Sequence, residues 1–209
     1  MQPQDFDRWR AEYDQMSYAD QVAFYNQVAE DHPHQVHFDA SAFELFLRHT
    51  IDQVGCVGVL EVGGWKGELA GKMLTRLPGI LVWINYEISQ TAAEQSVPKT
   101  DRYQVVVSDD FVWNITLPPC DVLVASHTIE HIKARELGAL IDNLPSTIKY
   151  IGLQAPLADS AQNVTWAGYW GSHILEIGWY EVVKMLDERG FMVLDKLTLG
   201  EFRAFERVR

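Results

Sequence analysis

The stretch that most constrains the fold runs from Val57 to Ala70 and reads V-G-V-L-E-V-G-G-W-K-G-E-L-A. An apolar run ends in an acid, Glu61, and Gly63, Gly64 and Gly67 follow before residues of helical character begin. This order predicts a buried strand, a tight turn and a helix. Glycine lets a turn approach a ligand closely, and the helix behind it offers free N–H groups. The sequence therefore predicts a ligand-binding turn here.

Apolar runs and helical segments alternate from this turn to the C-terminus. Strands are expected at 57–62, 80–86, 103–107, 121–125, 149–153, 191–197 and 202–208. Helices are expected before residue 54 and at 66–77, 90–96, 133–143 and about 182–189. Strands separated by helices indicate βαβ units and a mostly parallel sheet. Ligands of such sheets bind at the carboxyl ends of the strands, which is where the glycine turn would lie.

The composition excludes several classes of partner. The chain has 209 residues and a formal net charge of −12, which suits one domain with a small appendage. Such acidity disfavours a nucleic-acid-binding face or an anionic membrane surface as the partner. Cys56 and Cys120 are expected as reduced thiols. The N-terminus is polar and no long apolar run occurs, so we expect a cytoplasmic protein without a membrane span.

Acids stand at the ends of the next two predicted strands. Glu87 ends the second strand, about 20 residues beyond the glycines, where an acid can accept hydrogen bonds from both ribose hydroxyls. Asp109 ends the third strand and could contact an adenine amino group, although Asp110 could take that role. Either acid alone could be a solvated strand end or a helix cap. Together, the glycine turn and the two acids, which follow three successive strands at one edge of the sheet, favour an adenosine-containing ligand.

Several of these segments resemble class I S-adenosylmethionine-dependent methyltransferases. V-L-E-V-G-G-W-K-G resembles their first motif, C-D-V-L-V-A-S-H-T-I-E-H-I their fourth strand and its turn, and W-Y-E-V-V-K-M-L-D-E-R-G-F-M-V-L their last helix and the next strand. The resemblance implies an α/β fold with a Rossmann-like, seven-stranded, mostly parallel sheet, helices on both faces and an antiparallel last strand. It also implies an N-terminal helical cap over residues 1–55 and an S-adenosylmethionine-binding domain over residues 56–209.

The resemblance implies S-adenosylmethionine as the cofactor and a set of residues that contact it. The set is Glu61, Gly63, Gly64, Trp65, Gly67, Glu87, Ile88, Asp109, Asp110 and Ser126. Trp65 stands where the family usually has glycine, which would put a large ring beside the methionine part of the cofactor. It favours an alternative hypothesis, a non-catalytic binding module that retains the fold. A nicotinamide-dependent reductase would usually show the tighter G-x-G-x-x-G spacing, which is absent.

Methyl transfer requires that donor and acceptor be aligned, and a base can deprotonate the acceptor. The partner that we expect is a small molecule with a hydroxyl or amino group, and a homodimer is possible. His127 and His131 follow the fourth strand and are candidate bases. His173 is another, in a late stretch rich in Gly, Trp and Tyr that is either a binding loop or a cover for the sheet edge. His131 and His173 are the preferred candidates.

The histidines raise two metal hypotheses. H-x-x-E-H matches a zinc peptidase motif, but that motif needs a continuous helix and here it follows a buried strand, which disfavours a metal-dependent hydrolase. Two resembled methyltransferase subfamilies carry an acid-x-x-Glu-His metal site at this turn. The corresponding residues are His127, Glu130 and His131, with His173 as a possible fourth ligand. A divalent ion is possible there, but the sequence favours a protein without a resident metal.

Overall fold

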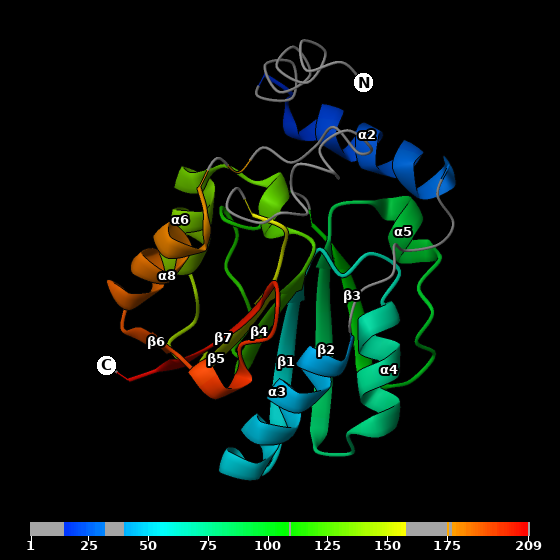
Figure 1. Ribbon diagram of the computed structural model, residues 1–209. Helices are drawn as coiled ribbons and strands as arrows, with labels where there is room; N and C mark the ends of the chain where they lie inside the picture. Colours follow the sequence, from blue (N-terminus) through cyan, green and yellow to red (C-terminus); the bar gives the residue numbers. More distant parts are fainter. Residues whose placement is uncertain (1–14, 32–39, 109, 158–174, 176, 209) are drawn as a thin grey trace.

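A computed structural model describes residues 15–31, 40–108, 110–157, 175 and 177–208 (Figure 1). Seven strands form one sheet in the order β3-β2-β1-β4-β5-β7-β6. Their bounds are β1 Val57–Val62, β2 Ile80–Glu87, β3 Tyr103–Val107, β4 Val122–Ser126, β5 Tyr150–Gln154, β6 Phe191–Val193 and β7 Phe202–Arg207. The pairs from β3 to β5 are parallel, and β7 runs antiparallel to β5 and β6. The predicted fold class is confirmed.

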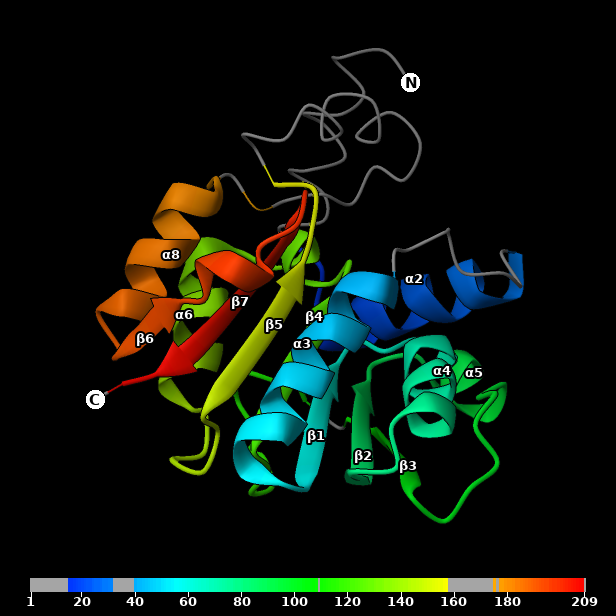
Figure 2. The same ribbon diagram turned by 60° about the horizontal axis from the view of Figure 1, so that its bottom comes forward.

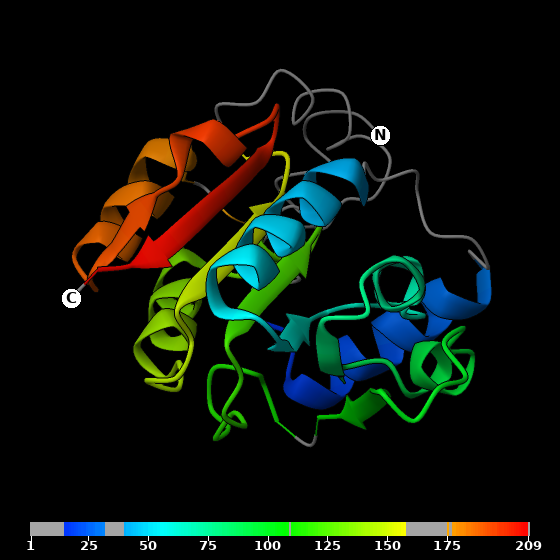
Figure 3. The same ribbon diagram turned by 90° about the horizontal axis from the view of Figure 1, so that it is seen from below.

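The described helices flank the sheet on both faces (Figures 2 and 3). Their bounds are α2 Tyr18–Asp31, α3 Ala40–Val54, α4 Glu68–Arg76, α5 Gln90–Glu94, α6 Ala134–Asp142 and α8 Trp179–Asp187, with short 3₁₀ helices η1 Ile129–His131 and η2 Asp195–Leu197. Side chains of α3 and α4 share one core with one face of the sheet. Those of α6 and α8 share a second core with the other face. No described helix is long and apolar enough to cross a membrane.

Strand β1 lies near the middle of the sheet and all six of its residues are buried. A parallel strand covered on both faces reads as a continuous apolar run, which is why the sequence predicts it well. The helix that follows begins later than predicted, at Glu68 rather than residue 66. Gly67 precedes it with φ 72°, a left-handed conformation that ends the turn before the helix can start.

The C-terminal strand prediction is partly wrong. The strand expected over 191–197 ends at Val193, and η2 takes up Asp195–Leu197. The Leu194 N–H still donates to the Ala204 carbonyl at 2.8 Å, but the chain then turns and Leu197 becomes 8% exposed in the core beneath α3. Burial of this leucine therefore replaces the last ladder bonds of the expected strand.

The two described N-terminal helices lie in different places. Phe43 and Phe46 of α3 are fully buried against the sheet, and Phe46 packs so closely on Gly152 that an added Cβ would lie 2.8 Å from its ring. Helix α2 instead crosses above the carboxyl ends of the strands (Figure 1). The expected division into a cap over 1–55 and a domain over 56–209 stays a prediction, although α3 shares the core of the sheet.

Candidate active site

The turn after β1 has an unusual backbone. Gly63 and Gly67 have φ values of 67° and 72°, and Trp65 between them has φ 52°. A left-handed residue with a side chain costs about 1–2 kcal/mol, so Trp65 carries strain where a glycine would not. Gly63 has a second reason to be glycine, because an added Cβ would lie 2.5 Å from Cγ2 of Thr128. The turn therefore packs directly on the segment that follows β4.

The N–H groups of this turn are used within the protein. The Gly63 N–H donates to the Tyr86 carbonyl, that of Gly64 to Asn85 Oδ1, that of Trp65 to Glu87 Oε2 and that of Gly67 to the Gly64 carbonyl, over 2.7–2.9 Å. A pyrophosphate cradle needs such groups free and aimed at the ligand. The turn is therefore unsuited to a dinucleotide, which adds to the spacing argument against a nicotinamide-dependent reductase.

Two buried acids lie beneath the turn. Glu61 is 1% exposed and accepts a hydrogen bond from Trp83 Nε1 at 2.7 Å. Glu87 is 2% exposed and accepts from the backbone N–H groups of Trp65 at 2.7 Å and Ser89 at 2.9 Å. Burial raises the pKa of Glu61 to about 8 and that of Glu87 to about 7. These acids support the turn from below, a role that the sequence reasoning missed.

Helix α2 closes over the same edge. Asn26 Oδ1 accepts from Ser89 Oγ at 2.9 Å and from the Thr91 N–H at 3.1 Å. Lys66, 4% exposed, donates to the Ala29 carbonyl at 3.2 Å. The Tyr18 hydroxyl donates to the Ser108 carbonyl, beyond the end of β3. Helix α2 is thus tied to the loops after β1, β2 and β3.

Aromatic rings gather at the end of β3. Phe111 and Trp113 stack with centroids 4.5 Å apart, and Tyr18 of α2 meets Phe111 edge-on at 5.0 Å. Asp110 Oδ1 accepts from the Phe111 N–H at 2.7 Å. The predicted contact Ile88 is half-buried beside Glu87, whereas Asp109 lies outside the described residues. The sequence analysis did not single out these rings, although Phe111-Val112-Trp113 directly follow the two aspartates in the sequence.

The end of β4 carries the candidate base. The backbone of His127 has a left-handed conformation, with φ 52°, and its side chain is 36% exposed. Its Nδ1 lies 3.4 Å from Oε1 of Glu130, whose side chain is 2% exposed. Burial works to lower the pKa of His127, but the hydrogen bond and charge of Glu130 and the charge of Glu201 outweigh it, and the net shift is upward. The sequence reasoning ranked His127 below two other histidines.

Of the other two candidate bases, His131 and His173, only His131 lies within the described residues. His131 closes η1, and its ring meets Tyr25 of α2 edge-on at 6.3 Å. His173 lies outside the described residues. Within the described part of the chain no three His, Cys, Asp or Glu side chains are grouped to hold a metal, and the four-residue set that includes His173 is untested. The H-x-x-E-H segment is a left-handed residue followed by one 3₁₀ turn, which lacks the continuous helix that a zinc peptidase motif needs.

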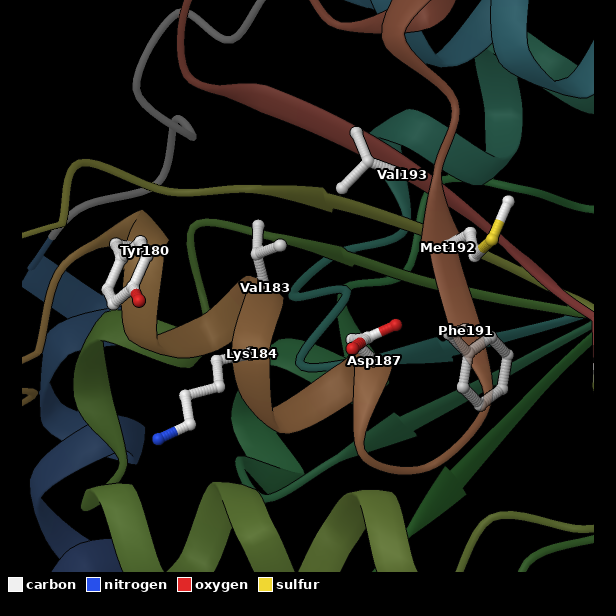
Figure 4. A pocket seen from close by; sticks show the side chains of 7 residues that line it. All are labelled: Tyr180, Val183, Lys184, Asp187, Phe191, Met192 and Val193. Carbon is white, nitrogen blue, oxygen red and sulfur yellow. The ribbon is translucent and has the colours of Figure 1, made fainter.

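A separate groove lies far along the sheet, between α8 and β6 (Figure 4). It has a volume of about 310 Å³ and is lined by Tyr180, Val183, Lys184, Asp187, Phe191, Met192 and Val193. Strands β4, β5 and β7 separate β6 from the glycine turn after β1. The groove contains none of the predicted site residues, so it is distinct from the candidate active site.

Comparisons with known proteins find likeness in structure only. No family model matches the chain, and no curated protein matches its sequence. Magnesium protoporphyrin IX methyltransferase from Synechocystis PCC 6803, solved with bound SAH, aligns with TM-score 0.63 and 14% identity over 92% of this chain and 100% of its own. A SAM-dependent methyltransferase from Archaeoglobus fulgidus aligns with TM-score 0.57 and 20% identity over 80% of this chain and 74% of its own. The N-methyltransferase NodS from Bradyrhizobium japonicum WM9 aligns with TM-score 0.56 and 13% identity over 79% and 93%. The chain therefore has the fold of class I S-adenosylmethionine-dependent methyltransferases.

Proposed function

We propose that this protein is an S-adenosylmethionine-dependent methyltransferase that acts on a hydroxyl or amino group of a small molecule. The observation that carries the proposal is the pairing of a glycine turn with two buried acids beneath it. Four N–H groups of the turn are already bonded within the protein, so they are not free to hold a phosphate, whereas Glu87 offers carboxyl oxygens to a ribose. A nucleoside ligand without a phosphate suits this edge, and S-adenosylmethionine is such a ligand.

Different residues along this edge of the sheet would contact the ribose, the adenine and the methionine part of the cofactor. Glu87 would face the ribose, because its carboxyl group has about four acceptor sites and the backbone N–H groups of Trp65, Ser89 and Ile88 do not use them all. Phe111 and Asp110 lie beyond β3, on the side where the adenine would extend. Gly63 and Trp65 would meet the methionine part. Helix α2 would then enclose the cofactor and exclude water.

The bound cofactor supplies an electrophilic methyl group on a sulfonium. His127 would act as the general base toward the acceptor. Its Nδ1 faces Glu130, so its Nε2 remains for the proton of the acceptor hydroxyl or ammonium. The buried carboxylate of Glu130 would hold the imidazole in this orientation and stabilise its protonated form. His127 is favoured as the base because the buried Glu130 carboxylate lies 3.4 Å from its Nδ1.

Calorimetry with S-adenosylhomocysteine and S-adenosylmethionine tests cofactor binding. We expect saturable binding of both, no binding of NAD, and affinity at least tenfold weaker in Glu87→Ala. Glu188→Ala is the control, because its side chain is 58% exposed directly after the end of α8 and far from the turn. No binding at millimolar ligand by a folded protein would end the proposal, and an unchanged affinity in Glu87→Ala would remove the ribose assignment.

A non-catalytic binding module is the second candidate function. The strained Trp65 and the 2% exposure of Glu87 favour it, since both close the cofactor edge in the described conformation. Such a module would bind the cofactor without transferring its methyl group, or would not bind the cofactor at all. Assays with methyl-labelled S-adenosylmethionine over a panel of phenols, catechols and amines separate the two. Turnover that His127→Asn abolishes supports the enzyme, and binding without turnover on any acceptor supports the module.

A further inference from the structure

Two buried side-chain oxygens at the ends of β4 and β5 have no hydrogen-bond partner in the part of the chain that the structure describes. Ser126 is 4% exposed and Gln154 is 9% exposed. Neither Ser126 Oγ nor Gln154 Oε1 has a hydrogen-bond partner among the described residues. The great majority of buried polar side-chain atoms in proteins have a hydrogen-bond partner, so each atom without one needs an explanation. An unpaired buried group lowers stability, so a ligand that completes its bonds is one such explanation.

The two residues are direct neighbours on the sheet. Parallel pairing of β4 with β5 places Ser126 opposite Gln154. Their side chains project from the same face, because residues two positions back on each strand, Val124 and Gly152, face the core beneath α3. Adjacent strands lie about 4.8 Å apart, so the two polar groups form one continuous patch.

The segment that follows Ser126 also contacts the glycine turn. The Thr128 hydroxyl, two residues beyond Ser126, lies 3.3 Å from the Gly63 carbonyl and 3.2 Å from the Ser126 carbonyl, so it can donate to either. His127 follows Ser126, and its N–H donates to the Gln154 carbonyl at 2.8 Å. The backbone of the candidate base thus lies beside the patch.

We propose that Ser126 and Gln154 form a recognition subsite for a polar group of the methyl acceptor. The group would carry both a hydrogen-bond donor and an acceptor, as a carboxamide or a hydroxyl does, because the serine hydroxyl and the glutamine amide each offer both. The acceptor atom would lie over β4 near His127, and the recognised group would lie over β5. The link to methyl transfer rests on the proposed function, whereas binding of the polar group does not.

A stability measurement tests whether the side-chain amide oxygen of Gln154 is unpaired. Gln154→Leu keeps most of the side-chain volume and removes the polar group. Gln104→Leu is the matched control, because Gln104 is exposed on β3. We expect the urea midpoint of Gln154→Leu to equal or exceed that of the wild type. A midpoint lower than that of Gln104→Leu would show that the chain itself satisfies Gln154, and would overturn the proposal.

A binding measurement tests whether the patch accepts a ligand. Acetamide, which carries one donor group and one acceptor, is titrated into ¹⁵N-labelled protein while the side-chain amide signals are followed. We expect a saturable shift at Gln154, at least fivefold weaker binding in Ser126→Ala, and only a linear change at Gln104. A linear change at Gln154 as well would overturn the subsite. Loss of cofactor binding with a saturable acetamide shift would defeat the methyltransferase proposal and leave the subsite standing.

Discussion

Replacing Glu61 with glutamine removes a buried acid while keeping the shape of the side chain. Glu61 lies beneath the glycine turn, 1% exposed, and accepts from Trp83 Nε1 at 2.7 Å, a bond that a glutamine oxygen can also accept. Burial raises the pKa of Glu61 to about 8; the Trp83 bond opposes the rise and the charge of Glu87 adds to it. At neutral pH the folded protein therefore holds a proton that the unfolded chain has released.

The sign of the pH effect follows from this difference. An acid whose pKa is raised by folding stabilises the folded state fully below its unfolded pKa of about 4.5, and this contribution is lost as the pH rises toward about 8. The slope approaches 1.36 kcal/mol per pH unit for one proton. Between about pH 5.5 and 7.5 the wild type should lose about 2–3 kcal/mol through Glu61, and Glu61→Gln should keep it.

Urea denaturation of the wild type and Glu61→Gln across this pH range measures the effect. The free energy of unfolding of the variant should gain about 2–3 kcal/mol relative to the wild type between the two pH values. Glu188→Gln is the control, because its side chain is 58% exposed and its difference from the wild type should stay constant. A constant difference for Glu61→Gln would refute the raised pKa and the account of a protonated acid under the turn.

Further predictions concern the turn, helix α2 and the base. Trp65→Gly should be about 1 kcal/mol more stable than Trp65→Ala, because both lose the indole but only glycine tolerates φ 52° without strain; equal urea stabilities would contradict this. Asn26→Ala removes the acceptor of the Thr91 N–H, so amide exchange in α2 should rise about tenfold by mass spectrometry, and unchanged protection would show that other contacts hold the helix. Glu130→Gln should lower the pKa of His127, so the rising limb of kcat/KM against pH should move to lower pH; an unmoved limb would remove His127 as the base that Glu130 orients.

Much of the fold could be predicted from the sequence because its central strands are buried on both faces. Strands β1 and β4 are apolar except for Glu61 and Ser126, and Pro78-Gly79 marks the break before β2. The short β6 could not be predicted in the same way. Its limit depends on Leu197 finding space beneath α3, which is a property of the packed structure.

The candidate site was predicted in outline but not in its contacts. The glycine turn and Glu87 meet at one edge as expected, because parallel strands bring their carboxyl ends together. The bonds of Asn85 to Gly64 and of Lys66 to Ala29 depend on strand register and on the docking of α2, which no local pattern encodes. Nor does the sequence reveal that the protein covers Glu87 with its own backbone.

A crystal structure of the protein with S-adenosylhomocysteine tests the central claim most directly. We expect the ribose to contact the Glu87 carboxylate and the adenine to extend toward Phe111. The sulfur should lie near Gly63, and the position of the missing methyl group should face Ser126 and His127. Helix α2 should lie over the ligand, with the bond between Lys66 and Ala29 intact or re-formed. A ligand bound elsewhere, or a glycine turn still closed over Glu87 at saturating S-adenosylhomocysteine, would contradict the account.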